Sequence, residues 1–184
     1  MGKKKKLRLL VTGTCNNRCP MCCNNHIDLN ALPVVDRWDY EEIKITGGEP
    51  LLFPNNLERL CDSIRELVRQ MGGTQPKIYI YTSRCRWNFV DRAIRYYADG
   101  LVVAPHSKDD LAFFRETNNK LLRYRYGKYQ TCDLQLRVFD EVKEALPENL
   151  NVWDVSRAEW SEHSSIPEDE DFRRVSELWI KDKW

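Results

Sequence analysis

Four of the seven cysteines of the chain lie together in the segment TCNNRCPMCC, residues 14–23. Cys15, Cys19 and Cys22 have the spacing C-x3-C-x2-C on a predicted loop, where three thiolates can converge on one metal centre. An iron–sulfur cluster normally takes four cysteine ligands, so three without an obvious fourth would leave one iron open to another molecule. Zinc is the alternative, because Cys23 or His26 could complete four tetrahedral ligands.

A second motif, ITGGEPLL, occupies residues 45–52, where an apolar run leads into Gly47, Gly48, Glu49 and Pro50. Two glycines let the backbone pass close to a bound ligand, and proline fixes the turn. Glu49 can accept a hydrogen bond from an ammonium group. Alone, the glycine pair is equally typical of an ordinary turn at the end of a strand.

Apolar, β-branched runs alternate with helical patterns in units of about 30 residues. The predicted strands are residues 7–12, 42–46, 77–83, 100–107, 134–139 and 150–155. The predicted helices are residues 55–71, 87–98, 108–124 and 167–182, the last opening with Pro167 and acidic residues that suit a helix N-terminus. Such alternation predicts a parallel sheet covered by helices, with the site at the carboxyl ends of the strands.

Six units are too few for a closed eight-stranded barrel. The predicted fold class is therefore α/β, a partial (β/α)6 barrel with a mostly parallel open sheet. Residues 1–6, rich in lysine, are predicted to be a flexible basic tail, and residues 7–184 to form the domain.

In this order and on adjacent units, the three-cysteine and GGEP motifs resemble those of the radical S-adenosylmethionine superfamily, in its minimal single-cluster form. The resemblance implies that Cys15, Cys19 and Cys22 ligate a [4Fe-4S] cluster. It also implies that S-adenosylmethionine chelates the fourth iron, with Gly47, Gly48, Glu49 and Pro50 lining its amino side. Met21 stands where the family often has an aromatic residue, and its thioether can contact the adenine ring.

The same resemblance implies that one electron from the cluster cleaves S-adenosylmethionine to a 5′-deoxyadenosyl radical, which takes hydrogen from a substrate. Further cofactor-binding candidates are polar residues at the predicted strand ends, where the family binds the methionine carboxylate and the ribose. These candidates are Thr82, Ser83, His106, Ser107 and Arg137. Each could equally be a solvent-facing strand end, although a histidine can hydrogen-bond a ligand in either protonation state.

The other cysteines carry separate predictions. Cys61 lies on the apolar stripe of the helix predicted at 55–71 and is expected to be a buried structural thiol. Cys85, between two arginines, is expected to be an ordinary exposed loop thiol rather than a reactive one. Cys23 is expected to be a structural neighbour of the motif rather than a ligand. No cysteine follows Cys132, so no second cluster is expected.

Composition limits the partners. The odd number of cysteines and the lack of a secretory or membrane-spanning pattern predict a protein of the reducing cytoplasm. A net charge of +1 argues against a general nucleic-acid surface. The stretch 121–130 interleaves tyrosine with basic residues, which suits either nucleotide or peptide binding or an amphipathic helix end.

The resemblance implies a small electron donor such as flavodoxin or ferredoxin. It leaves the substrate open between a peptide or protein and a small metabolite or nucleotide. Glycyl-radical activases, peptide modifiers and 7-deazaguanine synthases are the small relatives considered. The alternatives outside this class are a zinc- or cluster-bearing binding module without chemistry, and a nucleic-acid-binding protein that uses the lysine tail and the tyrosine-rich stretch 121–130.

Overall fold

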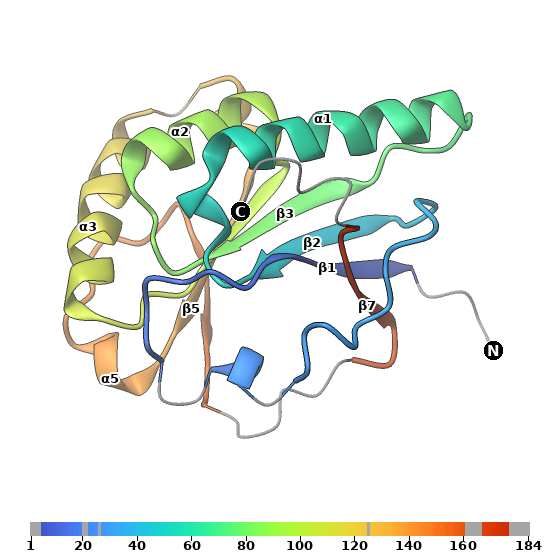
Figure 1. Cartoon of the computed structure of the whole chain (residues 1–184). Helices are drawn as coiled ribbons and strands as arrows, with labels where there is room; N and C mark the ends of the chain where they lie inside the picture. Colours follow the sequence, from blue (N-terminus) through green and yellow to red (C-terminus); the bar gives the residue numbers. More distant parts are fainter. Residues whose placement is uncertain (1–4, 20–21, 26, 125, 161–166, 177–184) are drawn as a thin grey trace.

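The computed structural model describes residues 5–19, 22–25, 27–124, 126–160 and 167–176. Within them, seven strands form one open sheet in which every neighbouring pair is parallel. The strands are β1 (Lys6–Thr12), β2 (Glu42–Gly47), β3 (Lys77–Thr82), β4 (Gly100–Val103), β5 (Asp133–Val138), β6 (Asp154–Arg157) and β7 (Glu170–Arg174). Their order across the sheet is β6-β5-β4-β3-β2-β1-β7 (Figure 1). All carboxyl ends therefore meet at one edge.

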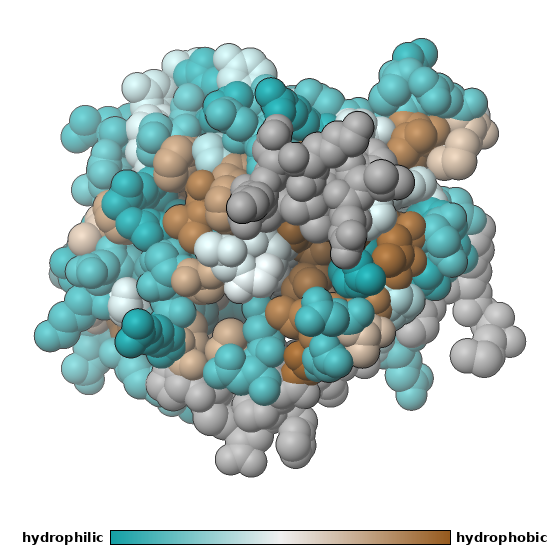
Figure 2. Space-filling view, viewed as in Figure 1, coloured by the Kyte–Doolittle hydropathy of each residue, from teal (hydrophilic) through white to brown (hydrophobic). Residues whose placement is uncertain are grey.

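The helices are α1 (Pro54–Gln70), α2 (Trp87–Tyr96), α3 (Lys108–Arg123), α4 (Lys128–Thr131) and α5 (Asp140–Lys143), with 3₁₀ turns η1 (Cys23–Asn25) and η2 (Pro50–Leu52). Helices α1 to α3 lie over the same face of the sheet (Figure 1). The apolar stripe of α1 is buried against it and includes Cys61, as predicted. The outer surface over α1 and α2 is mostly hydrophilic (Figure 2).

The two faces of the sheet differ in chemistry, because alternate residues of a strand point to opposite faces. Leu7 and Leu9 of β1 join the core under the helices, whereas Arg8 points to the other face. Lys44 of β2 and Arg137 of β5 also lie outside the core. Closed barrels fill this inner face with branched apolar side chains. Here the inner face is polar and partly open to solvent.

The first five strands confirm the predicted ones to within one or two residues at each end, except that β4 ends early. After Val103 the chain reaches Pro105, which has no amide hydrogen for a sheet. The sixth strand is displaced from 150–155 to Asp154–Arg157. Leu150 and Val152 pack on the core from a turn in which Trp153 N donates to Leu150 O. Their apolar side chains are therefore explained by burial, not by a strand.

The helix predicted at 167–182 is wrong in its described part, because residues 170–174 form β7 alongside β1. Glu170 is 2% exposed and pairs with Arg8 and Lys44, and Phe172 is buried on the same face. These partners are far away in the sequence and could not be recognised from it. Without them, the acidic run has the pattern of a helix N-terminus. Residues 177–182 lie outside the described residues.

The first connection also departs from the six predicted strand–helix units. Between β1 and β2 the described residues contain only η1 and no α-helix. Strand β1 begins at Lys6, inside the stretch predicted as a tail, since Lys6 pairs with Glu42 and Glu170 in the sheet. No described helix has the combination of length and apolar character needed to cross a lipid bilayer.

Candidate functional site

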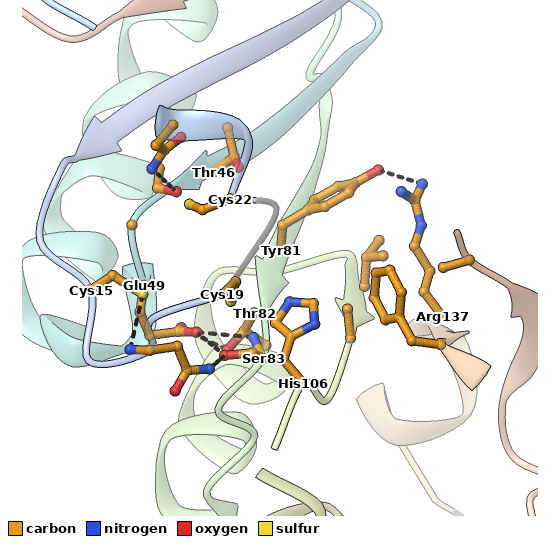
Figure 3. Close-up of a pocket in the computed structure, with 18 of the residues that line it drawn as sticks. Cys15, Cys19, Cys22, Thr46, Glu49, Tyr81, Thr82, Ser83, His106 and Arg137 are labelled. Carbon is orange, nitrogen blue, oxygen red and sulfur yellow. Dashed lines mark hydrogen bonds between the residues drawn. The ribbon is translucent and has the colours of Figure 1, made fainter. Parts of the chain in front are cut away.

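A cavity of about 320 Å³ opens at the carboxyl edge of the sheet and takes its walls from the ends of β2 to β5 and from the loops after β1 and β6. Ten of the predicted site residues line it. They are Cys15, Cys19, Cys22, Gly47, Gly48, Glu49, Thr82, Ser83, His106 and Arg137. Motifs far apart in the sequence therefore meet in one place (Figure 3).

Two other predicted residues do not line the cavity, and a third lies outside the described residues. Pro50 is buried and begins η2. The Ser107 hydroxyl accepts a hydrogen bond from Asp110 N at 3.1 Å and caps α3, which is a structural role. Met21 lies outside the described residues, so its predicted contact with adenine stays a prediction.

The three motif cysteines face the same cavity from the loop after β1. Cys15 is exposed, whereas Cys19 and Cys22 are partly buried. Burial and the neighbouring Cys22 and Cys15 raise the pKa of Cys19 to about 11, and burial also raises the pKa of Cys15. These two thiols are therefore protonated at neutral pH, and a metal that binds them must displace protons.

Among the described residues, no group of three or more histidine, cysteine, aspartate or glutamate side chains could hold a single metal ion. His26 and the side chain of Cys23 lie outside the described residues, so the predicted tetrahedral zinc set is not described as a whole. The donors that do line the cavity beside the glycine turn are three thiols, a soft set that suits iron–sulfur chemistry or zinc.

The glycine pair has a neighbour within the chain that the sequence did not indicate. A Cβ on Gly47, whose φ is +144°, would lie 2.3 Å from Thr12 O, and one on Gly48 would lie 1.9 Å from Thr14 O. Gly48 N donates to Thr12 O at 2.6 Å, and Glu49 N donates to Thr14 O at 2.8 Å. The glycines therefore admit the backbone that leads into the cysteine loop, as well as lining the cavity.

Glu49 is 1% exposed, and its carboxylate accepts hydrogen bonds from five donors. Oε1 accepts from Leu51 N at 3.1 Å and Thr82 Oγ1 at 2.6 Å, and Oε2 accepts from Ser83 N, Ser83 Oγ and Arg84 N. Burial raises the pKa of Glu49, and these hydrogen bonds oppose the rise. The carboxylate thus ties the end of β2 to the end of β3, and its contact with an ammonium group stays a prediction.

Two residues that the sequence analysis missed extend this network. Asn17 Nδ2, from within the cysteine loop, donates to Ser83 Oγ at 2.8 Å and to Asp110 Oδ2 at 3.0 Å. Asp110 is 2% exposed and also accepts from His106 N at 3.1 Å. Asn17 could have been suspected from its position between the cysteines. Asp110 was hidden, because an acid three residues after Ser107 is typical of a helix start.

The opposite end of the cavity is aromatic and cationic. Phe139 and Trp160 stack with ring centroids 4.2 Å apart, and the His106 ring lies 5.0 Å from each. The Arg137 guanidinium lies over the Tyr81 ring at 5.2 Å, and its Nη2 is 3.4 Å from the Tyr81 hydroxyl. Tyr81, Phe139 and Trp160 are further lining residues that no motif indicated.

Cys85 corrects a prediction, because its side chain is fully buried rather than exposed. The flanking Arg84 and Arg86 place their guanidinium groups over the Phe113 ring, and between them the thiol points into the core. Thr117 Oγ1 donates to Cys85 O at 2.6 Å. Burial raises the pKa of this thiol, which disfavours the reactive thiolate, and Cys85 is not among the residues that line the cavity.

The tyrosine-rich stretch 121–130 lies away from the cavity. Tyr124 and Tyr129 stack on Trp87 of α2, with centroids 5.4 and 6.2 Å away, and Arg95 lies over the Tyr129 ring. Tyr126 is 60% exposed at the margin of this cluster. The stretch therefore packs α2, α3 and α4 together, as expected for an amphipathic helix end.

Comparisons of the chain with models of protein families, with curated proteins and with solved structures gave no match. The interpretation of the site therefore depends on its own geometry and chemistry.

Proposed function

We propose that the chain is a radical S-adenosylmethionine enzyme with a partial-barrel fold, whose Cys15, Cys19 and Cys22 hold a [4Fe-4S] cluster. The observation that carries the proposal is that these three thiols line one cavity with Gly47 and Gly48, at the carboxyl edge of a parallel sheet. Brought together in space, the two motifs have the arrangement that the resemblance requires.

The donor set fits such a cluster. Its ligands bind separate iron atoms and so lie farther apart than the ligands of one tetrahedral ion. The three described thiols share one cavity, as the ligands of such a cluster must. When bound, the cluster supplies the electron that cleaves S-adenosylmethionine to a 5′-deoxyadenosyl radical, which abstracts hydrogen from the substrate.

The residues of the chain have three tasks in this proposal. The Glu49 network with Thr82, Ser83 and Asn17 holds the cysteine loop against β3. The close approach of Gly48 to the residues before Cys15 fixes the start of the loop. Phe139 and Trp160 give the far end of the cavity an apolar surface, where a radical needs protection from water and stray hydrogen donors.

The remaining partners belong to the proposal as well. A small electron donor such as flavodoxin or ferredoxin would reduce the cluster, and the reducing cytoplasm would preserve it.

The test is anaerobic reconstitution with iron and sulfide, reduction with dithionite and an assay for 5′-deoxyadenosine. We expect Cys19→Ala to lower the formation of 5′-deoxyadenosine by at least about 100-fold. The variant leaves only two protein ligands, and a cluster held by two ligands is lost. Cys132→Ala is the matched control, since Cys132 is partly buried but does not line the cavity. Equal product from Cys19→Ala and the wild type would refute the ligand assignment. Tight zinc without product would favour the binding module.

A further inference from the structure

Two polar groups at the aromatic end of the cavity lack the partners that the rest of the cavity provides. His106 Nδ1 is buried and has no hydrogen-bond partner among the described residues. Arg137 is the only lysine or arginine among the described residues that line the cavity, and no described carboxylate lies within ion-pair distance of it. Its contacts among the described residues are with the ring and the hydroxyl of Tyr81.

Three other cations on the inner face of the sheet are paired with carboxylates. Arg8 Nη2 is 2.7 Å from Glu170 Oε2, Lys44 also pairs with Glu170, and Lys6 Nζ is 2.7 Å from Asp169 Oδ2. The exposed guanidinium of Arg137 is instead held over an aromatic ring, which limits its orientation without neutralising its charge. An orientated, uncompensated cation in a cavity attracts an anion.

The position of Arg137 separates this anion from the proposed cofactor. The carboxylate of S-adenosylmethionine that chelates iron would lie beside the cysteines. Arg137 lies on β5, whereas the cysteine loop reaches the end of β3 and the start of α3 through Asn17. In Figure 3 the cysteines and Arg137 occupy opposite sides of the cavity, with Tyr81 and His106 between them.

We infer that Arg137 binds the anionic group of the substrate, a small organic carboxylate or phosphate whose flat apolar part rests on the Phe139–Trp160 pair. The stacked rings offer an apolar surface beside the cation, and flat rings pack on such surfaces. His106 Nδ1 can hydrogen-bond a polar atom of the same ligand. The inference rests on the proposed function, because it takes this end of the cavity as the substrate end.

The test uses the full-length chain as purified and three single-ring probes at constant ionic strength. Benzoate and phenyl phosphate carry an anion, whereas benzamide has the shape of benzoate without its charge. Equilibrium dialysis gives each dissociation constant. We expect saturable binding of at least one anion, and benzamide to bind at least about tenfold more weakly, because hydrogen bonds to charged groups are the stronger ones. Whichever of benzoate and phenyl phosphate binds more tightly shows whether the site prefers a carboxylate or a phosphate.

Arg137→Gln is expected to weaken binding of the anion at least about tenfold and to leave benzamide unchanged. Arg157→Gln is the matched control: Arg157 is an exposed arginine on the neighbouring strand β6, but it pairs with Asp140 and does not line the cavity. Arg137→Lys keeps the charge without the planar fork and should bind several-fold more weakly than the wild type. This conservative variant is a second, independent test of the contact between Arg137 and the anion.

Failure to bind either anion, equal binding of benzoate and benzamide, or equal losses in Arg137→Gln and Arg157→Gln would overturn the inference. These measurements need no cluster. Anion binding through Arg137 in a chain that forms no 5′-deoxyadenosine would therefore contradict the proposed function alone. Product formation with no role for Arg137 in anion binding would contradict only the present inference.

Discussion

The two ends of the cavity differ in how completely their polar groups are paired. At the cysteine end, the carboxylate of Glu49 has five donors, and Asn17 and Asp110 continue the same network. At the aromatic end, His106 Nδ1 has no described partner and Arg137 has only a long contact with Tyr81. The polar side chains of the first end are hydrogen-bonded to one another. The second end has polar groups that could gain a partner from a bound ligand.

This difference has an energetic meaning. A buried polar group with all its hydrogen bonds helps to define one arrangement, whereas an unpaired one costs free energy of folding. The cysteine end should therefore be sensitive to substitution in both stability and metal content. The aromatic end should tolerate substitution in stability and respond in ligand binding.

The largest effect on stability is expected from Gly48→Ala. The added Cβ would lie 1.9 Å from Thr14 O and 2.4 Å from Thr14 C, so the backbone before Cys15 must move. Because this contact fixes the start of the cysteine loop, we expect a loss of at least about 3 kcal/mol in the free energy of unfolding. We also expect most of the bound iron to be lost, measured by denaturant titration and iron analysis.

Gly13→Ala serves as the control, since a Cβ there would meet only Leu29 Cδ1 at an ordinary 3.8 Å. Normal iron content and stability in Gly48→Ala would show that the two loops are not coupled through this contact. The glycine turn would then serve the cofactor alone, as the sequence analysis predicts.

A smaller loss is expected from Glu49→Gln. Oε1 accepts from Leu51 N, and Oε2 accepts from two backbone N–H groups, so either orientation of the amide leaves a backbone N–H facing an NH₂. We expect the free energy of unfolding to fall by about 2 kcal/mol. Glu159→Gln, at an exposed lining position, should change it by less than about 0.5 kcal/mol. Equal effects of the two variants would remove the proposed difference between the ends.

The smallest effect is expected from His106→Phe. The substitution removes a buried nitrogen that has no described partner and keeps a ring beside the stacked Phe139 and Trp160. The free energy of unfolding should stay within about 1 kcal/mol of the wild type, or rise slightly. A loss of more than about 2 kcal/mol in the free energy of unfolding, measured by denaturant titration, would mean that His106 has a structural partner. Its Nδ1 would then not be a free group for a ligand.

The sequence predicts most of the strands whose ends form the cavity. Buried parallel strands read as continuous apolar runs, so β1 to β5 could be located, and with them the edge where the cysteine and glycine motifs meet. It does not predict β7, because Glu170 is stabilised by Arg8 and Lys44 from distant strands. Burial of Cys85 likewise depends on how the neighbouring arginines contact Phe113.

The two ends of the cavity were also unequally predictable. The cysteine end follows from two local motifs, although the motifs did not indicate that Glu49 would bind the end of β3 or that Asn17 would reach Asp110. The aromatic end is assembled from β3, β4, β5 and the residues after β6, and single residues such as Tyr81 and Trp160 carry no local signature. Only the three-dimensional arrangement brings them together.

The most direct test of the central claim is the electron paramagnetic resonance spectrum of the reconstituted, dithionite-reduced protein, with and without S-adenosylmethionine, alongside iron and sulfide analysis. We predict about four iron and four sulfide per chain. We also predict a cluster signal that changes when S-adenosylmethionine is added, because one iron lacks a protein ligand. A chain that holds one zinc ion and no cluster, or a cluster signal that S-adenosylmethionine leaves unchanged, would contradict the account.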